Sequence, residues 1–146
     1  MASIIIAIIS AVISLVAIIV SIRSFLQGKK EAFQNEAQKL ISQKNEFLNS
    51  YMQICTGDFD DETREYLMSE ITGNYCNAFE SACSLYLKNA IDKQLFKATF
   101  IDEVKTICSG EGIAAGLELP VSRNSEEVYK ALRTVGTEWG VLKQHE

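Results

Sequence analysis

Residues 2–22 contain no charged side chain, and this run constrains the fold more than any other feature of the chain. Thirteen of its 21 positions are Ile, Val or Leu. As a helix, these residues would span about 31 Å, which matches a bilayer hydrocarbon core about 30 Å thick. The Ile, Val and Leu residues alone favour insertion by about 4–8 kcal/mol. The sequence therefore predicts a transmembrane anchor at residues 2–22.

The alternative is a cleaved signal peptide, which has a positively charged start, a shorter apolar run and a cleavage site of small residues. No charged side chain precedes Ile4, and residues 21–25 read Ser-Ile-Arg-Ser-Phe, which is a poor cleavage site. The uncleaved anchor is the better interpretation.

Positive charge lies at only one end of the apolar run, in Arg23, Lys29 and Lys30. Positively charged flanks stay on the cytoplasmic side of a membrane. These three residues therefore predict a single-pass protein with its N-terminus outside and residues 23–146 in the cytoplasm.

Small residues recur every three or four positions along the run: Ser3, Ala7, Ser10, Ser14, Ala17 and Ser21. In lipid, small residues let two helix backbones approach, and serine hydroxyls can form hydrogen bonds across the contact. The stripe predicts a packing face for self-association or for a partner's membrane helix. The other interpretation is a chance alignment of residues that are common in membrane spans.

The rest of the chain carries all 14 basic and 19 acidic residues, for a net charge of -5. An acidic balance argues against general nucleic-acid binding, which requires cationic surface. The single histidine, His145, lies near the end of the chain and leaves little scope for histidine catalysis or metal binding. We expect no cofactor and find no motif for a small-molecule substrate.

Residues 23–57 predict an amphipathic helix that leaves the membrane. Gly28 lies between this helix and the anchor as a possible swivel, and Gly57 suits the left-handed position that ends a helix. The apolar side of the helix has the 3.6-residue period and consists of Phe33, Ala37, Leu40, Phe47, Tyr51 and Ile54.

Residues 58–146 predict a helical bundle that packs with residues 29–55, so that the cytoplasmic part is a compact bundle of four or five helices and the fold class is all-α. The acidic run 58–62 favours a helix N-terminus over a cation site. A helix follows from Asp61 to Ala90, which residues 72–74 can bend or break, and Asp92 caps the next helix, which ends at Ser109. The expected buried face of the 61–90 helix comprises Tyr66, Leu67, Ile71, Tyr75, Phe79, Ala82, Tyr86 and Leu87.

The last helix is expected to begin near Ser125. Its apolar side consists of Val128, Leu132, Val135, Trp139 and Leu142. Before it, residues 110–116 superficially resemble a dinucleotide-binding loop, but that fingerprint requires a preceding strand. A helix-to-helix turn is the better interpretation.

The four cysteines, at positions 55, 76, 83 and 108, form no Cys-x-x-Cys pair, so buried free thiols are favoured over a redox or metal pair. Four aromatic residues have two possible roles: Tyr66, Tyr75, Tyr86 and Trp139. Their helical spacing is typical of core residues, but tyrosine and tryptophan also anchor protein interfaces. They are the candidate partner-docking residues.

The segments Phe79-Glu80, Leu85-Tyr86-Leu87, Ile91-Asp92 and Leu95-Phe96, with Phe100 and Trp139, form a pattern of apolar and aromatic residues over positions 45–142. This pattern resembles uncharacterised small bacterial proteins with one N-terminal span and a cytoplasmic helical domain, some of which are associated with phage defence. The resemblance implies a bacterial inner-membrane location and carries over no catalytic residue.

Three functional hypotheses follow. The first is a non-enzymatic, membrane-anchored interaction protein that docks a cytoplasmic or membrane partner and self-associates through its span. The second is a membrane-disrupting effector of a phage-defence or toxin system, and the third is a small membrane enzyme that uses carboxylates.

Overall fold

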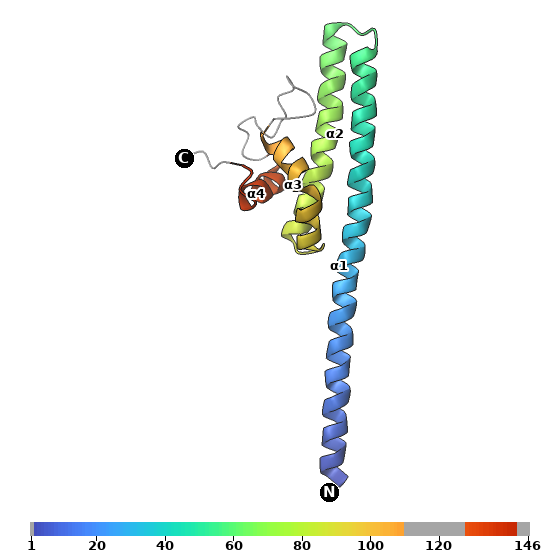
Figure 1. Cartoon of the computed structure of the whole chain (residues 1–146), viewed down its shortest axis with the longest axis vertical. Coiled ribbons are helices and arrows are strands. Elements are labelled where there is room, and N and C mark those ends of the chain that lie inside the picture. The colour runs from blue at the N-terminus through green and yellow to red at the C-terminus, as the bar shows by residue number, and fades with distance from the viewer. Residues whose placement is uncertain (1, 110–127, 143–146) are drawn as a thin grey trace.

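The structure is a computed structural model that describes residues 2–109 and 128–142, with side chains from residue 10 onward. In these ranges the chain forms four helices and no strand (Figure 1). They are α1 (Ala2–Thr56), α2 (Asp61–Leu87), α3 (Lys93–Ser109) and α4 (Lys130–Glu138). The all-α prediction is confirmed. The expected turn at residues 110–116 lies outside the described residues, as does His145.

Helix α1 runs without a break for 55 residues, which corresponds to about 82 Å. The predicted swivel at Gly28 is therefore wrong, because this residue lies inside the helix and no side chain meets the position of its missing Cβ. A single glycine costs a helix only about 1 kcal/mol relative to alanine. The strong helix formers around it, such as Leu26 and Lys29, keep the hydrogen-bond ladder continuous.

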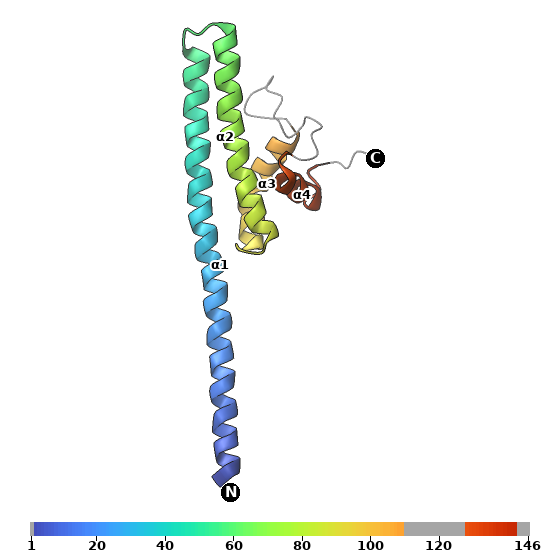
Figure 2. The same ribbon diagram turned by 180° about the vertical axis from the view of Figure 1, so that it is seen from behind.

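Helix α2 folds back along the second half of α1, so the two form a long antiparallel hairpin (Figures 1 and 2). Gly57 in the connection does not adopt the predicted left-handed conformation. Its role is steric instead, because a Cβ at this position would collide with the Phe59 ring and lie 2.9 Å from the Gln53 carbonyl oxygen. Helix α2 also continues through residues 72–74, where the sequence allowed a bend or a break.

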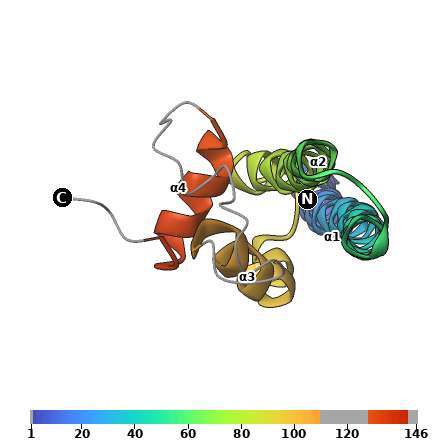
Figure 3. The same ribbon diagram turned by 90° about the horizontal axis from the view of Figure 1, so that it is seen from above.

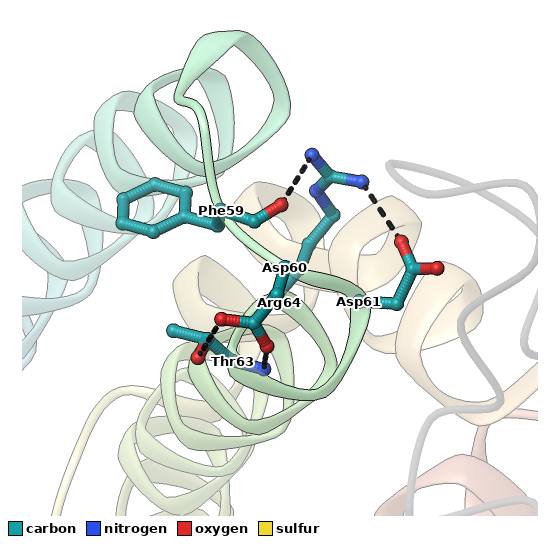
Figure 4. A network of polar contacts seen from close by, with 5 residues as sticks. All are labelled: Phe59, Asp60, Asp61, Thr63 and Arg64. Carbon is teal, nitrogen blue, oxygen red and sulfur yellow. Dashed lines mark hydrogen bonds and ion pairs between the residues drawn. The ribbon is translucent and has the colours of Figure 1, made fainter.

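The acidic run after Gly57 caps α2, as predicted. The Asp60 carboxylate accepts hydrogen bonds from the backbone N–H and from the hydroxyl of Thr63, each 2.8 Å long (Figure 4). Both bonds lower the pKa of Asp60 because they favour its ionised form. Arg64 braces the same turn by donating to the Phe59 carbonyl oxygen at 3.2 Å and to Asp61 at 3.5 Å.

Helices α3 and α4 pack against α2, with α4 on the side away from α1 (Figure 3). Asp92 caps α3 as predicted, since its carboxylate accepts the N–H groups of Gln94 and Leu95 at 3.1 Å. Helix α3 ends at Ser109, also as predicted.

The predicted start of the last helix near Ser125 lies outside the described residues, and α4 itself begins at Lys130. Tyr129 precedes it in a left-handed conformation with φ 58°, and Val128, expected on the apolar side, is exposed. The local sequence offers no side-chain cap at Tyr129. The Glu80 carboxylate of α2 replaces that cap by accepting the N–H groups of Ala131 and Leu132 at 2.9 and 2.8 Å.

Aromatic rings form a continuous path through the core and connect all four helices. Phe47 of α1 stacks on Tyr75 of α2 with ring centroids 4.9 Å apart. The path continues through Phe79 to Phe100 and Phe96 of α3, and ends at Trp139, next to α4. Such pairs contribute about 0.5–1.5 kcal/mol each beyond burial of their area. They bind the second half of α1 to the bundle.

Candidate functional site

The first half of α1 has an apolar surface that no other described element covers. From Val12 to Ile22 the large side chains are between 45% and 64% exposed. The helix is long and apolar enough to cross a membrane. The protein therefore does not bury the segment that the sequence assigns to a bilayer.

Four members of the predicted packing face have described side chains, and all four are exposed: Ser10, Ser14, Ala17 and Ser21. At about 100° per residue they lie within about 60° of one another around the helix. The Ser14 hydroxyl donates to the Ser10 carbonyl oxygen at 2.9 Å. Ser3 and Ala7 belong to the same helix, but their side chains lie outside the described part.

The predicted topology residues lie just beyond this apolar surface. Arg23 and Lys30 are exposed, whereas Lys29 is half-buried and places its ammonium group 4.6 Å from the centre of the Phe25 ring. Positive charge thus begins within one helical turn of the last residue of the apolar run and continues on the bundle side.

Three of the four candidate docking aromatics lie in the core. Tyr75, Tyr86 and Trp139 are 3%, 4% and 8% exposed. The Trp139 indole N–H donates to the Tyr86 hydroxyl at 3.1 Å, which in turn donates to the Glu138 carboxylate at 2.6 Å. Burial raises the pKa of both tyrosines, and the bond to Glu138 raises that of Tyr86 further. Tyr86 and Trp139 thus join α2 with the end of α4, whereas Tyr75 joins α2 with α1 through its stacking on Phe47.

The fourth aromatic, Tyr66, is 68% exposed, so it does not belong to the buried face of α2 as the periodicity suggested. It lies one and a half turns after the start of α2, near the connection between α1 and α2. Met52, Cys55 and Phe59 are also exposed near this connection. We refer to Met52, Phe59 and Tyr66 as the hairpin-tip patch.

Met52 and Phe59 were not among the residues predicted from the sequence to be functional. The buried residues of α1 recur at intervals of seven, at Phe33, Leu40, Phe47 and Ile54. Met52 lies outside that repeat, and this phase mismatch is the signal that marks it as a surface residue. The same end of the hairpin is acidic, since Asp58, Asp61, Glu62 and Glu65 are exposed.

The cysteines divide into two classes. Cys76, Cys83 and Cys108 are buried free thiols, as predicted, whereas Cys55 is exposed. Burial raises the pKa of Cys76 to about 12 and that of Cys108 to about 11, and it also raises the pKa of Cys83. The buried thiols therefore stay protonated and unreactive at neutral pH. Within residues 2–109 and 128–142, no group of His, Cys, Asp and Glu is arranged to hold a metal ion.

Comparisons of the chain with protein-family models, curated proteins and solved structures find no match. The resemblance to small bacterial membrane proteins thus stays a prediction. The functional argument depends on the geometry of the chain itself.

Proposed function

We propose that this chain is a non-enzymatic, single-span protein of the bacterial inner membrane that holds a helical interaction domain at a set height above the bilayer. The continuity of α1 carries the proposal. One helix supplies both the uncovered apolar segment and, from Phe33 to Ile54, one side of the bundle core. From Arg23 to Thr56 the helix extends about 50 Å, so the hairpin tip stands far from the membrane end.

The charge distribution supports the orientation. Arg23, Lys29 and Lys30 follow the apolar segment directly, so the bundle lies in the cytoplasm by the positive-inside rule.

A second copy of the chain is the proposed partner of the small-residue face. Ser10, Ser14, Ala17 and Ser21 expose little side-chain volume on one side of the helix, which allows two backbones to approach. The larger residues Val12 and Ile19 lie on the opposite side. The contact proposed is therefore a parallel pair of α1 helices within the bilayer.

Fluorescence energy transfer between labelled copies in lipid vesicles tests the contact. The double variant Ser10→Leu/Ser14→Leu adds bulk to the face and is expected to reduce transfer, whereas Val12→Phe/Ile19→Phe adds bulk to the opposite side and should leave it unchanged. Equal transfer in both variants would remove the small-residue face from the proposal. Release of vesicle contents by the wild-type protein would favour the membrane-disrupting alternative.

The hairpin-tip patch is the proposed docking surface for a cytoplasmic protein with an apolar spot and a basic border. Met52, Phe59 and Tyr66 supply exposed apolar and aromatic area, and aromatic side chains are common interface anchors. Five acidic residues and one arginine within residues 58–65 give this end of the hairpin a net charge of -4. That charge selects a basic partner and steers its approach.

Co-purification of the full-length protein in mild detergent tests the docking surface. A stoichiometric partner is expected to be lost in Met52→Ala/Tyr66→Ala and retained in Leu95→Ala/Val128→Ala, which removes exposed apolar side chains elsewhere. The partner should also dissociate as salt concentration rises. Retention in the first variant would remove the patch from the proposal.

A further inference from the structure

A pocket of about 310 Å³ lies where the bundle meets the membrane end of α1. Its α1 wall consists of Leu26, Lys29 and Lys30, and its other wall is the turn between α2 and α3, which includes Asn89, Ile91 and Lys93. Figures 1 and 2 show this turn beside α1, at the end of the bundle nearest the N-terminus. Residues about 60 positions apart thus form one site.

The pocket has a net positive charge. Lys29, Lys30 and Lys93 face one carboxylate, that of Asp92, so the lining carries a charge of +2. Asp92 already accepts two N–H groups of α3. The lysine ammonium groups are held less firmly. That of Lys29 lies 4.6 Å from the centre of the Phe25 ring, and that of Lys93 lies 4.6 Å from the centre of the Tyr86 ring.

The helix termini beside the pocket do not offset this charge. At the end of α2, the N–H groups of Lys88, Asn89 and Ala90 satisfy carbonyl oxygens of the last turn at 3.0 Å. At the start of α3, the N–H groups of Gln94 and Leu95 are satisfied by Asp92. The lysines therefore determine which ligand the pocket attracts.

The position of the pocket along α1 matches the level of the headgroup layer of the membrane. If the hydrocarbon core ends near Ile22, Leu26 lies about 6 Å and Lys30 about 12 Å beyond it. The headgroup layer is about 5–8 Å thick on each side. Helical side chains point back towards the N-terminus, and lysine extends its charged end towards the interface. The lysine ammonium groups can thus reach the level of the lipid phosphates.

We propose that this junction pocket binds the phosphate group of an anionic phospholipid from the membrane that α1 spans. The proposal rests on the proposed membrane anchor. Leu26, which is 53% exposed, provides apolar surface for the upper part of an acyl chain, and the three lysines are placed to surround the phosphate. A bound lipid would link α1 to the α2–α3 turn and hold the bundle at one angle to the membrane surface.

Native mass spectrometry of the full-length protein in mild detergent tests the pocket, with phosphatidylglycerol and phosphatidylcholine of the same acyl chains as probes. The wild-type protein is expected to retain phosphatidylglycerol preferentially. Lys93→Gln should lower the apparent affinity about fivefold, because a lysine near an anionic headgroup contributes about 1 kcal/mol. Lys29→Gln/Lys30→Gln/Lys93→Gln should abolish the preference, and Lys93→Arg should preserve it.

A matched control separates the pocket from general charge effects. Lys39→Gln/Lys105→Gln/Lys130→Gln removes three exposed lysines outside the pocket and should leave the lipid preference unchanged. The proposed lipid site would be contradicted if the two triple variants lost the preference for phosphatidylglycerol equally, or if Lys93→Gln left it unaltered. Inorganic phosphate that competes as strongly as the lipid at equal concentration would also overturn it, because the site would then bind a free anion.

Failure of the anchor gives a different result. Alkaline carbonate extraction of the wild-type membranes is expected to leave the protein in the pellet. Release into the supernatant would overturn the proposed anchor, whereas retention without preference for phosphatidylglycerol would overturn the pocket alone.

Discussion

Helix α1 carries two apolar segments, residues 10–22 and residues 33–54, whose side chains have opposite surroundings. In the first, large apolar residues cover every side of the helix except the small-residue face, and they stay exposed. In the second, Phe33, Leu40, Phe47 and Ile54 lie seven residues apart and are buried by the bundle. The difference teaches that the angular distribution of apolar residues determines the environment a helix requires. A stripe is satisfied by a neighbouring helix, whereas a fully apolar surface requires lipid or further copies.

The largest expected difference between the halves comes from removing one phenylalanine ring from each. Phe47→Ala should lower the free energy of unfolding by about 3–5 kcal/mol, because it leaves a cavity beside Tyr75. Phe25→Ala should change it by less than about 0.5 kcal/mol, since Phe25 is 62% exposed. Denaturation of the full-length protein, followed by fluorescence of Trp139, measures both. Similar losses would contradict the division of α1.

A charge placed in the first half should act on the membrane and leave the bundle intact. Ile13→Arg is expected to disfavour insertion by about 3 kcal/mol, because arginine at the centre of a span costs about that amount. The fraction of protein that resists carbonate extraction should fall, with Trp139-detected unfolding unchanged. Ile41→Arg makes the same substitution at an exposed site in the second half and should leave retention unchanged. If both variants stay in the membrane, residues 10–22 are not the anchor.

The buried thiols of α2 and α3 predict that alkaline pH destabilises the bundle and leaves the first half of α1 unaffected. Cys76 has its pKa raised to about 12 from an ordinary value of 9.0. Because the folded state binds the proton more tightly, its contribution is fully present below pH 9 and is lost as pH rises towards 12. The unfolding free energy should fall by about 1.4 kcal/mol per pH unit for each such thiol. Residues 10–22 carry no titratable side chain, so membrane retention should not change.

Cys76→Ala provides the check on this assignment. Denaturation curves recorded from pH 8 to pH 11 should show a shallower loss of stability in the variant. An identical slope would assign the pH dependence to other groups.

The smallest expected effect lies at the junction of the two halves. Gly28→Ala should stabilise the helix by about 0.5–1 kcal/mol, because no neighbouring atom obstructs the added methyl group. Hydrogen exchange of the amides of residues 26–32 should slow accordingly. If these amides exchange rapidly in the wild-type protein and the variant does not slow them, the helix opens at Gly28 and the two halves of α1 can move relative to each other.

Local signals in the sequence predicted the helical fold well. Asp60 and Asp92 cap helices as expected, since each carboxylate bonds to amides two or three residues away. The predictions failed where a residue distant in the sequence determines the start of a helix. Val128 was expected on a buried helix face, but α4 begins only at Lys130, where Glu80 accepts its free amides. Glu80 lies about 50 positions earlier in the chain, beyond the reach of any local pattern.

The candidate site divides in the same way. The small-residue face and the positive charges beyond it follow from sequence spacing, whereas the separation of Tyr66 from Tyr75, Tyr86 and Trp139 does not. All four aromatics occur in apolar helical patterns, and packing against other helices separates them. Tyr75 stacks on Phe47 of α1, whereas Tyr86 and Trp139 pack on Phe96 of α3.

The sequence by itself determined the apolar run, the caps at the starts of α2 and α3, and the apolar side of α1 between residues 33 and 54. Each of these depends on transfer free energy or on hydrogen bonds within one helical turn, which are properties of local composition. Only the tertiary structure decided which tyrosine is exposed, where α4 begins and that Lys93 lies beside Lys29 and Lys30. These outcomes depend on which surfaces pack together. Burial of apolar surface stabilises contacts between segments that are distant in the sequence, and no local interaction specifies those contacts.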